Sequence, residues 1–264
     1  MSRLSIALLG GMTLLLTLSV GLNFALFDRA KQYYTEVNAT RLDPIGLGAY
    51  EKIDRRVEPT KEENIRVVFM GDSRAASWPA PTAEGYEFIN RGIGSQTSVQ
   101  VLQRFSDHVV PLRPDVVILQ VGINALKTIA LFPENATEIV ANAKFNIEQL
   151  ITESEKIGAV VVVSSILPAG KITLARRAFW SDDIYAAADA LNQHLLTLAE
   201  VNKTDKIVWF DAFAVVADTQ GRMDAEYRKD ELHLNAAGYE ALNQSLATQL
   251  PSISQLVHSG DDFK

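Results

Sequence analysis

Short apolar runs alternate with longer amphipathic stretches from residue 65 onward. The apolar runs lie near residues 65–70, 86–90, 115–121, 159–166 and 207–211, and the stretches with helical spacing lie near 97–110, 136–157 and 183–203. The run at 115–121 is almost continuously apolar, which is typical of a strand buried on both faces. Alternating strands and helices predict an α/β domain, a flavodoxin-like three-layer α/β/α sandwich with a mostly parallel five-stranded sheet.

The first part of the chain has a different pattern. After a head of residues 1–5, the segment from Ile6 to Phe27 is uncharged and mostly apolar, and its 22 residues match a hydrocarbon core of about 30 Å. We therefore expect a transmembrane helix at 6–27 that inserts in a lipid bilayer as an uncleaved signal anchor. A cleaved signal peptide is the alternative, but its apolar region is shorter, and Leu22 to Phe27 offers no good cleavage site.

The charges that flank this segment give conflicting indications about its orientation. Arg29, Lys31 and Arg41 follow the span and only Arg3 precedes it, which by charge alone would keep the following domain inside the cell. A very short head before an apolar segment is typical of signal anchors, however, and long domains are exported largely regardless of charge. We expect a single-pass protein whose folded domain is extracytoplasmic, in the periplasm or at the cell surface.

The remaining boundaries follow from composition. Residues 28–63 are polar and charged, and they predict a juxtamembrane helix around 30–37 followed by a linker that contains Pro44 and Pro59. The α/β pattern fills residues 64–250, and we expect a frayed tail at 251–264. A chain of 264 residues has room for this one domain and its extras, but not for a second catalytic domain.

Charge and cysteine content exclude several classes of protein. The net charge of −7 argues against a nucleic-acid partner, because binding phosphates requires clustered Lys and Arg. The chain contains no cysteine, which excludes disulfides, a thiolate nucleophile and a lipid-modified amino-terminal cysteine.

The strongest candidate for chemistry follows the first apolar run, at Gly71-Asp72-Ser73. A strand that ends in a glycine turn before a helix is a geometry that presents a nucleophilic serine to a pocket. Asp and Ser are also common helix caps, so the tripeptide by itself is equally compatible with a purely structural role.

A base and its orienting group lie far downstream, at Asp230-Glu231-Leu232-His233. An aspartate three residues before a histidine can accept the Nδ1 proton and leave Nε2 free to deprotonate a serine hydroxyl. A solvated loop histidine would produce the same spacing, so the pair is informative only together with Ser73.

Donors for an oxyanion are found between these two segments. Asn124 follows the third predicted strand, and a turn of small residues at Gly94-Ser95 follows the second. The side-chain N–H of Asn124, the backbone N–H of Ser73 and one from the Gly94-Ser95 turn would supply three donors. The alternative for Asn124 is an ordinary turn former.

These four segments, in this order, resemble the SGNH hydrolases, also called GDSL esterases, whose sequence blocks centre on Ser, Gly, Asn and His. The resemblance implies a Ser-His-Asp triad, an acyl-enzyme intermediate and chemistry that needs no metal and no organic cofactor. The chain departs from the family pattern at Arg74, where the family nickname has leucine, at Ser95, where the family glycine would fall, and at Ala125, where many relatives carry an acidic residue.

We expect a serine esterase that acts on short-chain or O-acetyl esters of a small molecule or a glycan. Arg74, Trp78 and Trp180 are candidate substrate contacts. Trp180 lies in a basic-aromatic loop, for which the alternative interpretation is a solvated amphipathic turn with no role in binding. Two alternatives remain: an acyltransferase that uses the same triad on a glycan acceptor, and a non-catalytic membrane-anchored binding protein. The sequence predicts no oligomeric state.

Overall fold

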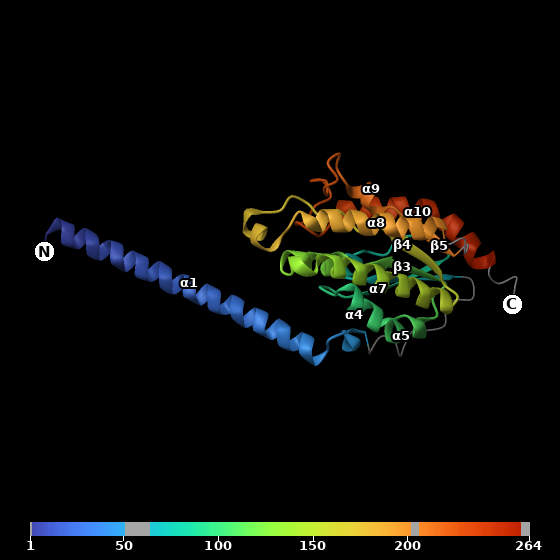
Figure 1. The fold of residues 1–264 in the computed structure, drawn as a ribbon, viewed down its shortest axis with the longest axis horizontal. Helices are drawn as coiled ribbons and strands as arrows, with labels where there is room; N and C mark the ends of the chain where they lie inside the picture. Colours follow the sequence, from blue (N-terminus) through green and yellow to red (C-terminus); the bar gives the residue numbers. More distant parts are fainter. Residues whose placement is uncertain (1, 51–63, 202–205, 260–264) are drawn as a thin grey trace. The chain divides into compact units, whose positions relative to one another are not determined.

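The computed structural model describes residues 2–50, 64–201 and 206–259, and it divides into two units, Met1–Gly46 and Leu47–Lys264 (Figure 1). The first unit consists mainly of one helix, α1 (Arg3–Leu42), which Ser2 caps by accepting a hydrogen bond from Ser5 N. This helix is long and apolar enough to cross a membrane, as a membrane anchor or a signal sequence would be.

The helix α1 corrects one expectation about the region after the span. The predicted juxtamembrane helix is not separate, because α1 continues from the apolar segment to Leu42 without a break. No proline or glycine lies between Phe27 and Leu42, so nothing in the sequence stops the helix there, and Pro44 follows soon after its end. Most of the predicted linker, residues 51–63, lies outside the described residues.

The second unit is built on a parallel five-stranded sheet. Its strands are β1 (Ile65–Gly71), β2 (Tyr86–Gly92), β3 (Val116–Gln120), β4 (Val160–Ser164) and β5 (Ile207–Phe210), in the order β2-β1-β3-β4-β5. Every neighbouring pair is parallel. This is the flavodoxin-like strand order, so the predicted fold class is confirmed.

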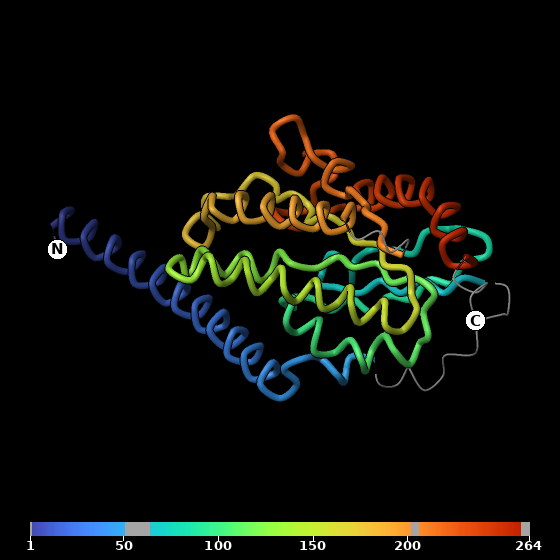
Figure 2. Tube along the Cα trace, turned by 45° about the vertical axis from the view of Figure 1, so that its right-hand side comes forward, coloured from blue at the N-terminus to red at the C-terminus, as the bar shows by residue number. Residues whose placement is uncertain are grey.

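Helices run along both sides of this sheet (Figure 2). They are α3 (Ser73–Ala76), α4 (Ser98–Gln103), α5 (Phe105–His108), α6 (Ile123–Leu126), α7 (Ala136–Lys156), α8 (Asp183–Val201), α9 (Ala212–Val216) and α10 (Ala236–Ser259). Short 3₁₀ segments are η1 (Leu47–Ala49), η2 (Val110–Leu112), η3 (Lys127–Ala130), η4 (Pro133–Asn135) and η5 (Leu174–Phe179).

Successive strand residues face opposite hydrophobic layers. Val68 and Met70 of β1 belong to a core that also contains apolar residues of α4, α5, α7 and α8, whereas Val67 and Phe69 belong to a core formed with α9 and α10. The central strands β1, β3 and β4 are fully buried, which explains why they read as nearly continuous apolar runs rather than as alternating ones. The edge strand β2 is mostly half-buried and carries Glu87, Asn90 and Arg91.

Two predicted elements have different boundaries in the structure. The helix expected at 97–110 is broken at Arg104, whose buried guanidinium donates hydrogen bonds to Gly71 O at 2.9 Å and to Arg91 O at 2.7 Å. The expected frayed tail is wrong as far as Ser259, because α10 continues past Pro251. Ile253 is buried in the core there, and this burial compensates for the backbone hydrogen bond that the proline removes.

Candidate active site

Ser73 is the first residue of α3, at the point where β1 ends. Gly71 makes the close approach of β1 and β3 possible, since a Cβ at this position would lie 1.9 Å from Gln120 O. Asp72 caps the helix by accepting a hydrogen bond from Arg74 N at 2.9 Å. Asp72 is therefore a helix cap, which is the structural role that the sequence analysis considered for the Gly71-Asp72-Ser73 tripeptide. The half-buried side chain of Ser73 does not cap the helix and is available to act as a nucleophile.

Three side chains form a hydrogen-bonded chain across the carboxyl ends of the strands. His233 Nε2 lies 3.0 Å from Ser73 Oγ, and His233 Nδ1 lies 2.9 Å from Asp230 Oδ2. With the Nδ1 proton directed at the carboxylate, Nε2 of a neutral imidazole can accept the serine proton. The structure thus brings together the nucleophile, the base and the orienting group predicted from two distant segments.

The loop that carries the histidine also fixes the carboxylate. Asp230 Oδ1 accepts hydrogen bonds from Leu232 N and His233 N, each at 2.8 Å. Partial burial alone would raise the pKa of Asp230, but these backbone hydrogen bonds and the one from the His233 ring outweigh it, and the pKa lies below its usual value. Asp230 therefore stays ionised and keeps its orientation toward the imidazole.

The predicted oxyanion donors lie around the serine. A Cβ built on Gly94 would lie 4.0 Å from Ser73 Cβ, so the Gly94-Ser95 turn lies beside the nucleophile. The backbone N–H of Ser73 is in the first turn of a helix, where no intrahelical acceptor exists. Asn124 is 8% exposed, and its Nδ2 donates to Gln96 O at 3.0 Å, which orients the amide and leaves its second N–H.

Ser95 has a positive φ of 64°, the left-handed region that favours glycine. The turn therefore has the backbone conformation that a glycine would adopt without cost, although serine occupies the position. The left-handed backbone explains physically why the family pattern named in the sequence analysis has a glycine here.

Arg74 and Trp78 are corrections to the sequence analysis, because neither side chain can touch a bound ester. Arg74 is 1% exposed, and its guanidinium donates to Leu232 O at 2.9 Å and to Leu167 O at 2.7 Å. Trp78 is 2% exposed in the core, with Nε1 donating to Asn243 Oδ1 at 2.7 Å. Arg74 instead ties the loop that carries His233 to the loop that follows β4.

A cavity of about 330 Å³ adjoins His233 and Asn124. Trp180 lines it, as the sequence analysis anticipated for a substrate contact, together with Phe179 of η5. Lys127 also lines it, and sequence reasoning missed this residue. The available signal was its spacing, three residues after Asn124, which places both side chains on one helical face.

Lys127 and Arg176 line this cavity together with two carboxylates, Asp230 and Glu231. Burial lowers the pKa of the Lys127 ammonium, while the Asp72 carboxylate opposes that shift. Among the residues that the structure describes, no three His, Cys, Asp or Glu side chains are grouped as a metal site requires.

Comparison with known proteins places the chain in a family. Residues 59–241 match the model of the GDSL-like Lipase/Acylhydrolase family. The fold is similar to that of a GDSL-like lipase from Bacteroides thetaiotaomicron, with 24% identity, a TM-score of 0.64 and coverage of 80% of this chain and 98% of that one. No curated protein matches the chain.

The fold is also similar to that of an acetylxylan esterase from Geobacillus stearothermophilus, with 16% identity, a TM-score of 0.56 and coverage of 71% of this chain and 95% of that one. Because the family model covers most of its length, the chain belongs to the GDSL-like Lipase/Acylhydrolase family and is an ester-hydrolysing enzyme.

Proposed function

We propose that this acylhydrolase is a serine esterase whose catalytic triad is Ser73, His233 and Asp230. The observation that carries the proposal is the continuous hydrogen-bonded chain from Ser73 Oγ through the His233 ring to the Asp230 carboxylate, with distances of 3.0 and 2.9 Å. A nucleophile, its base and the orienting group of that base within hydrogen-bond reach form the constellation that acyl transfer requires.

The reaction would proceed in two halves. Ser73 Oγ attacks the ester carbonyl carbon as its proton passes to His233 Nε2, and His233 then gives that proton to the departing alcohol. Water attacks the resulting acyl-enzyme with His233 again acting as base, and the acid leaves with Ser73 restored. In both halves the oxyanion would be held by Ser73 N–H, the Gly94-Ser95 turn and Asn124 Nδ2.

We infer that the acyl group is short, as in an O-acetyl ester, and that the alcohol is a glycan. The cavity beside His233 has about 330 Å³, at the small end of the range for ligand pockets. Trp180 in its wall offers an aromatic face of the kind that stacks on sugar rings. An acetylxylan esterase among the proteins of similar fold fits this substrate class.

We also propose that α1 anchors the enzyme in a bilayer as a single-pass helix with the sheet domain outside the cytoplasm. The length and composition of α1 support the anchor. A glycan ester at the cell surface or in the periplasm would then be within reach of the domain.

The test is the Ser73→Ala variant, assayed with 4-nitrophenyl acetate and with a fluorophosphonate label. We expect the rate to fall by at least about 10³-fold, and the label to be lost, since the serine and histidine act as one unit. Ser77→Ala is the matched control, because Ser77 is an exposed serine one helical turn away. Activity near wild type in Ser73→Ala would refute the triad.

A second measurement separates hydrolysis from acyl transfer. Free acid should be the only acyl product when a glycan acceptor is added to the reaction. An O-acylated acceptor in its place would show that the same triad serves a transferase.

A further inference from the structure

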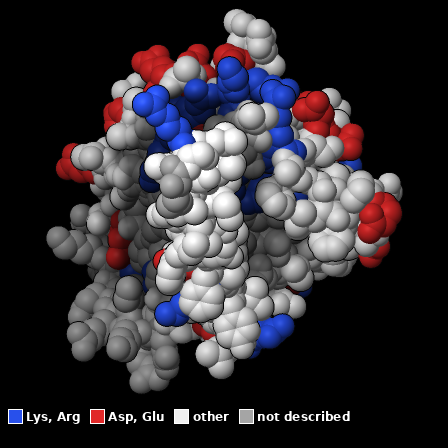
Figure 3. All heavy atoms as spheres, turned by 90° about the vertical axis from the view of Figure 1, so that its left-hand side faces the viewer, with Lys and Arg blue, Asp and Glu red and all other residues white. Residues whose placement is uncertain are grey.

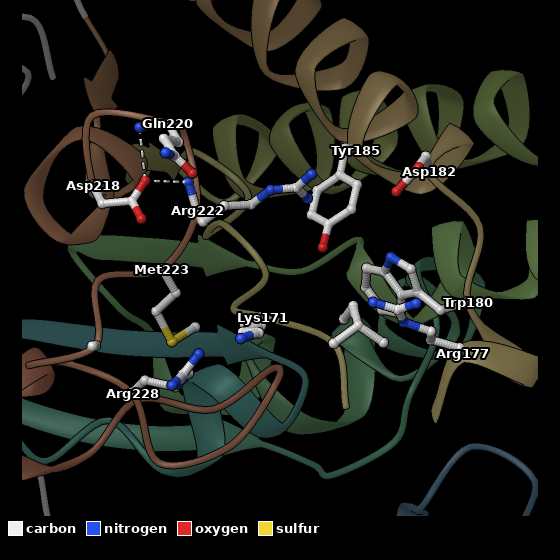
Figure 4. Close-up of a pocket in the computed structure, with 12 residues that line it drawn as sticks. Lys171, Arg177, Trp180, Asp182, Tyr185, Asp218, Gln220, Arg222, Met223 and Arg228 are labelled. Atoms are coloured by element: carbon white, nitrogen blue, oxygen red, sulfur yellow. Dashed lines mark hydrogen bonds between the residues drawn. The ribbon is translucent and has the colours of Figure 1, made fainter. Parts of the chain in front are cut away.

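A second and larger cavity has a volume of about 860 Å³ (Figure 4). It adjoins the cavity beside His233, because the two cavities share lining residues. Ile172 and Trp180 line both cavities, so the loop that contains η5 forms the wall between them. Neither the triad nor the proposed oxyanion donors line the second cavity. Its size exceeds what one acetyl group needs, and its place fits a part of the substrate that does not react.

The lining of this second cavity is rich in cations. Lys171, Arg177, Arg222 and Arg228 all contribute to it. Among the described residues, none of these four side chains forms an ion pair with a carboxylate. Two carboxylates, Asp182 and Asp218, line the same cavity, so its four cations outnumber its carboxylates. In a chain with a net charge of −7, this local excess of positive charge would attract an anion. Figure 3 shows Lys and Arg atoms gathered in the upper part of one face of the molecule.

Arg222 is held in place without a carboxylate partner. Its guanidinium lies 3.2 Å from the centre of the Tyr185 ring, and Asp218 Oδ1 accepts a hydrogen bond from its backbone N at 2.9 Å. Its Nη1 atom is buried and has no hydrogen-bond partner. A buried donor without an acceptor is costly, and a guanidinium that keeps its unused donors is ready to bind an oxyanion.

Other lining residues suit a sugar ring rather than a simple ion. Trp180 and Tyr185 lie edge to face with ring centres 5.5 Å apart, and Trp180 Nε1 is buried without a hydrogen-bond partner. Asp182 and Asp218 also line the cavity and can accept hydrogen bonds from hydroxyl groups. Asp182 and Asp218 would repel a phosphate dianion more strongly than a sugar with one carboxylate. Such a sugar can pair its carboxylate with the cations of the lining and donate hydrogen bonds from its hydroxyl groups to the two aspartates.

The wall between the cavities is tied to the loop that carries the histidine. Gly170 N donates to Glu231 O at 2.9 Å, and Thr173 Oγ1 donates to Glu231 Oε1 at 2.7 Å. Glu231 lies two residues before His233, so these bonds hold the second cavity at a fixed place beside the proposed catalytic base.

We propose that the second cavity is a binding subsite for a carboxylate-bearing sugar, so that the substrate is an O-acylated acidic glycan built with uronic-acid units. This inference rests on the proposed function, because it places the ester of one sugar at Ser73 while a neighbouring uronate occupies the subsite. The carboxylate pairs with Arg222 and Lys171, and the sugar ring packs against Trp180.

The test compares two substrates of equal length, an O-acetylated oligogalacturonate and a neutral O-acetylated xylo-oligosaccharide. The measured quantity is the ratio of their kcat/KM values. In the Lys171→Gln/Arg177→Gln variant the ratio should fall about tenfold, since the contact of Lys171 with the carboxylate is lost and Arg177 no longer adds positive charge to the cavity. Both side chains are exposed, so this variant should fold. Arg222→Gln is a second variant and should lower the ratio further.

Lys156→Gln is the matched control. Lys156 is an exposed cation in the last turn of α7. This turn leads to the amino end of β4, whereas Ser73 lies at the carboxyl ends of the parallel strands. Its variant should keep the wild-type ratio. A ratio that is the same in wild type, in Lys171→Gln/Arg177→Gln and in Arg222→Gln would overturn the inference.

Binding of acetate-free oligogalacturonate, measured by calorimetry, separates this inference from the proposed function. Binding that weakens about tenfold in the Lys171→Gln/Arg177→Gln variant, and that weakens with added salt, supports the subsite even if Ser73 proves not to be the nucleophile. Wild-type protein that cleaves 4-nitrophenyl acetate through Ser73 but does not bind the oligogalacturonate would overturn the subsite and leave the esterase standing.

Discussion

Replacing Asn124 by alanine separates a role in the transition state from a role in packing. The side chain is 8% exposed, and its one described hydrogen bond runs from Nδ2 to Gln96 O at 3.0 Å. Alanine removes this bond inside the protein, which should cost about 1 kcal/mol of stability. For a domain of this size that loss corresponds to a decrease in Tm of about 2–4 °C.

The effect on the rate should be much larger than the effect on stability. The second N–H of the Asn124 amide would contact the oxyanion, which carries its full charge only near the tetrahedral intermediate. Loss of one such donor lowers kcat by about 10²–10³, or about 2.7–4 kcal/mol. KM should change little, because the uncharged carbonyl of the bound ester gains less from the donor.

Initial rates with 4-nitrophenyl acetate and a thermal melt of the same samples measure both effects. Asn146→Ala is the matched control, because Asn146 is 9% exposed and its Nδ2 also donates one described hydrogen bond, to Ser98 Oγ at 3.2 Å. It should lose similar stability and keep its kcat. If Asn124→Ala kept wild-type kcat, or changed only KM, the assignment of Asn124 to the oxyanion hole would be refuted.

Three further predictions follow from other parts of the structure. Ser95→Gly should keep esterase activity and raise the stability measured by urea unfolding by up to about 1 kcal/mol, since glycine adopts the positive φ of 64° without strain; destabilisation would show that the Ser95 side chain contributes a compensating contact. The pKa of Asp230 is lower in the folded protein than its unfolded value near 3.8, so the ionised carboxylate contributes stability above that pH, and this contribution is lost as the pH falls through the folded-state pKa. The Tm of Asp230→Asn should therefore depend less on pH below about 4 than the Tm of wild type does. The same dependence of Tm on pH in both proteins would contradict this. A shortened chain that begins at Leu47 should be soluble and active, whereas the full chain should sediment with membranes and resist carbonate extraction; an inactive but folded short chain would show that α1 contributes to the site.

The sheet and the proximity of Ser73, His233 and Asp230 could be predicted because the signals that specify them are local or repeated. The central strands are nearly continuous apolar runs, β2 is a shorter run that includes Glu87, and the predicted and observed boundaries of all five strands agree to within two residues. Residues at the carboxyl ends of parallel strands converge at one edge, so Ser73 and Asn124 could be placed near each other before any coordinates existed. The spacing of Asp230 and His233 predicts a pair only in combination with the upstream Ser73.

Side-chain direction could not be predicted in the same way. Arg74 directly follows the nucleophile, and an arginine at a helix start is usually solvated; here the carbonyl groups of Leu232 and Leu167, from segments far away in the sequence, accept its hydrogen bonds and hold it inside. The length of α10 could not be predicted for a related reason. Pro251 predicts that the helix stops, but burial of Ile253 in the core, which the local sequence does not show, accompanies its continuation to Ser259.

The order of the proposed triad along the chain would determine when the enzyme can begin to act. Ser73 and His233 are 160 positions apart, and the histidine lies in the loop just before the last helix. A nascent polypeptide emerging from a ribosome therefore carries its serine long before it has a base, and α10, which completes one of the two hydrophobic cores, comes later still. Any fragment that a protease or a stalled ribosome produces between these positions has an inert hydroxyl. With this triad, hydrolysis would begin only when synthesis is essentially complete, and partly made chains would have no means of cleaving esters in the compartment where they are assembled.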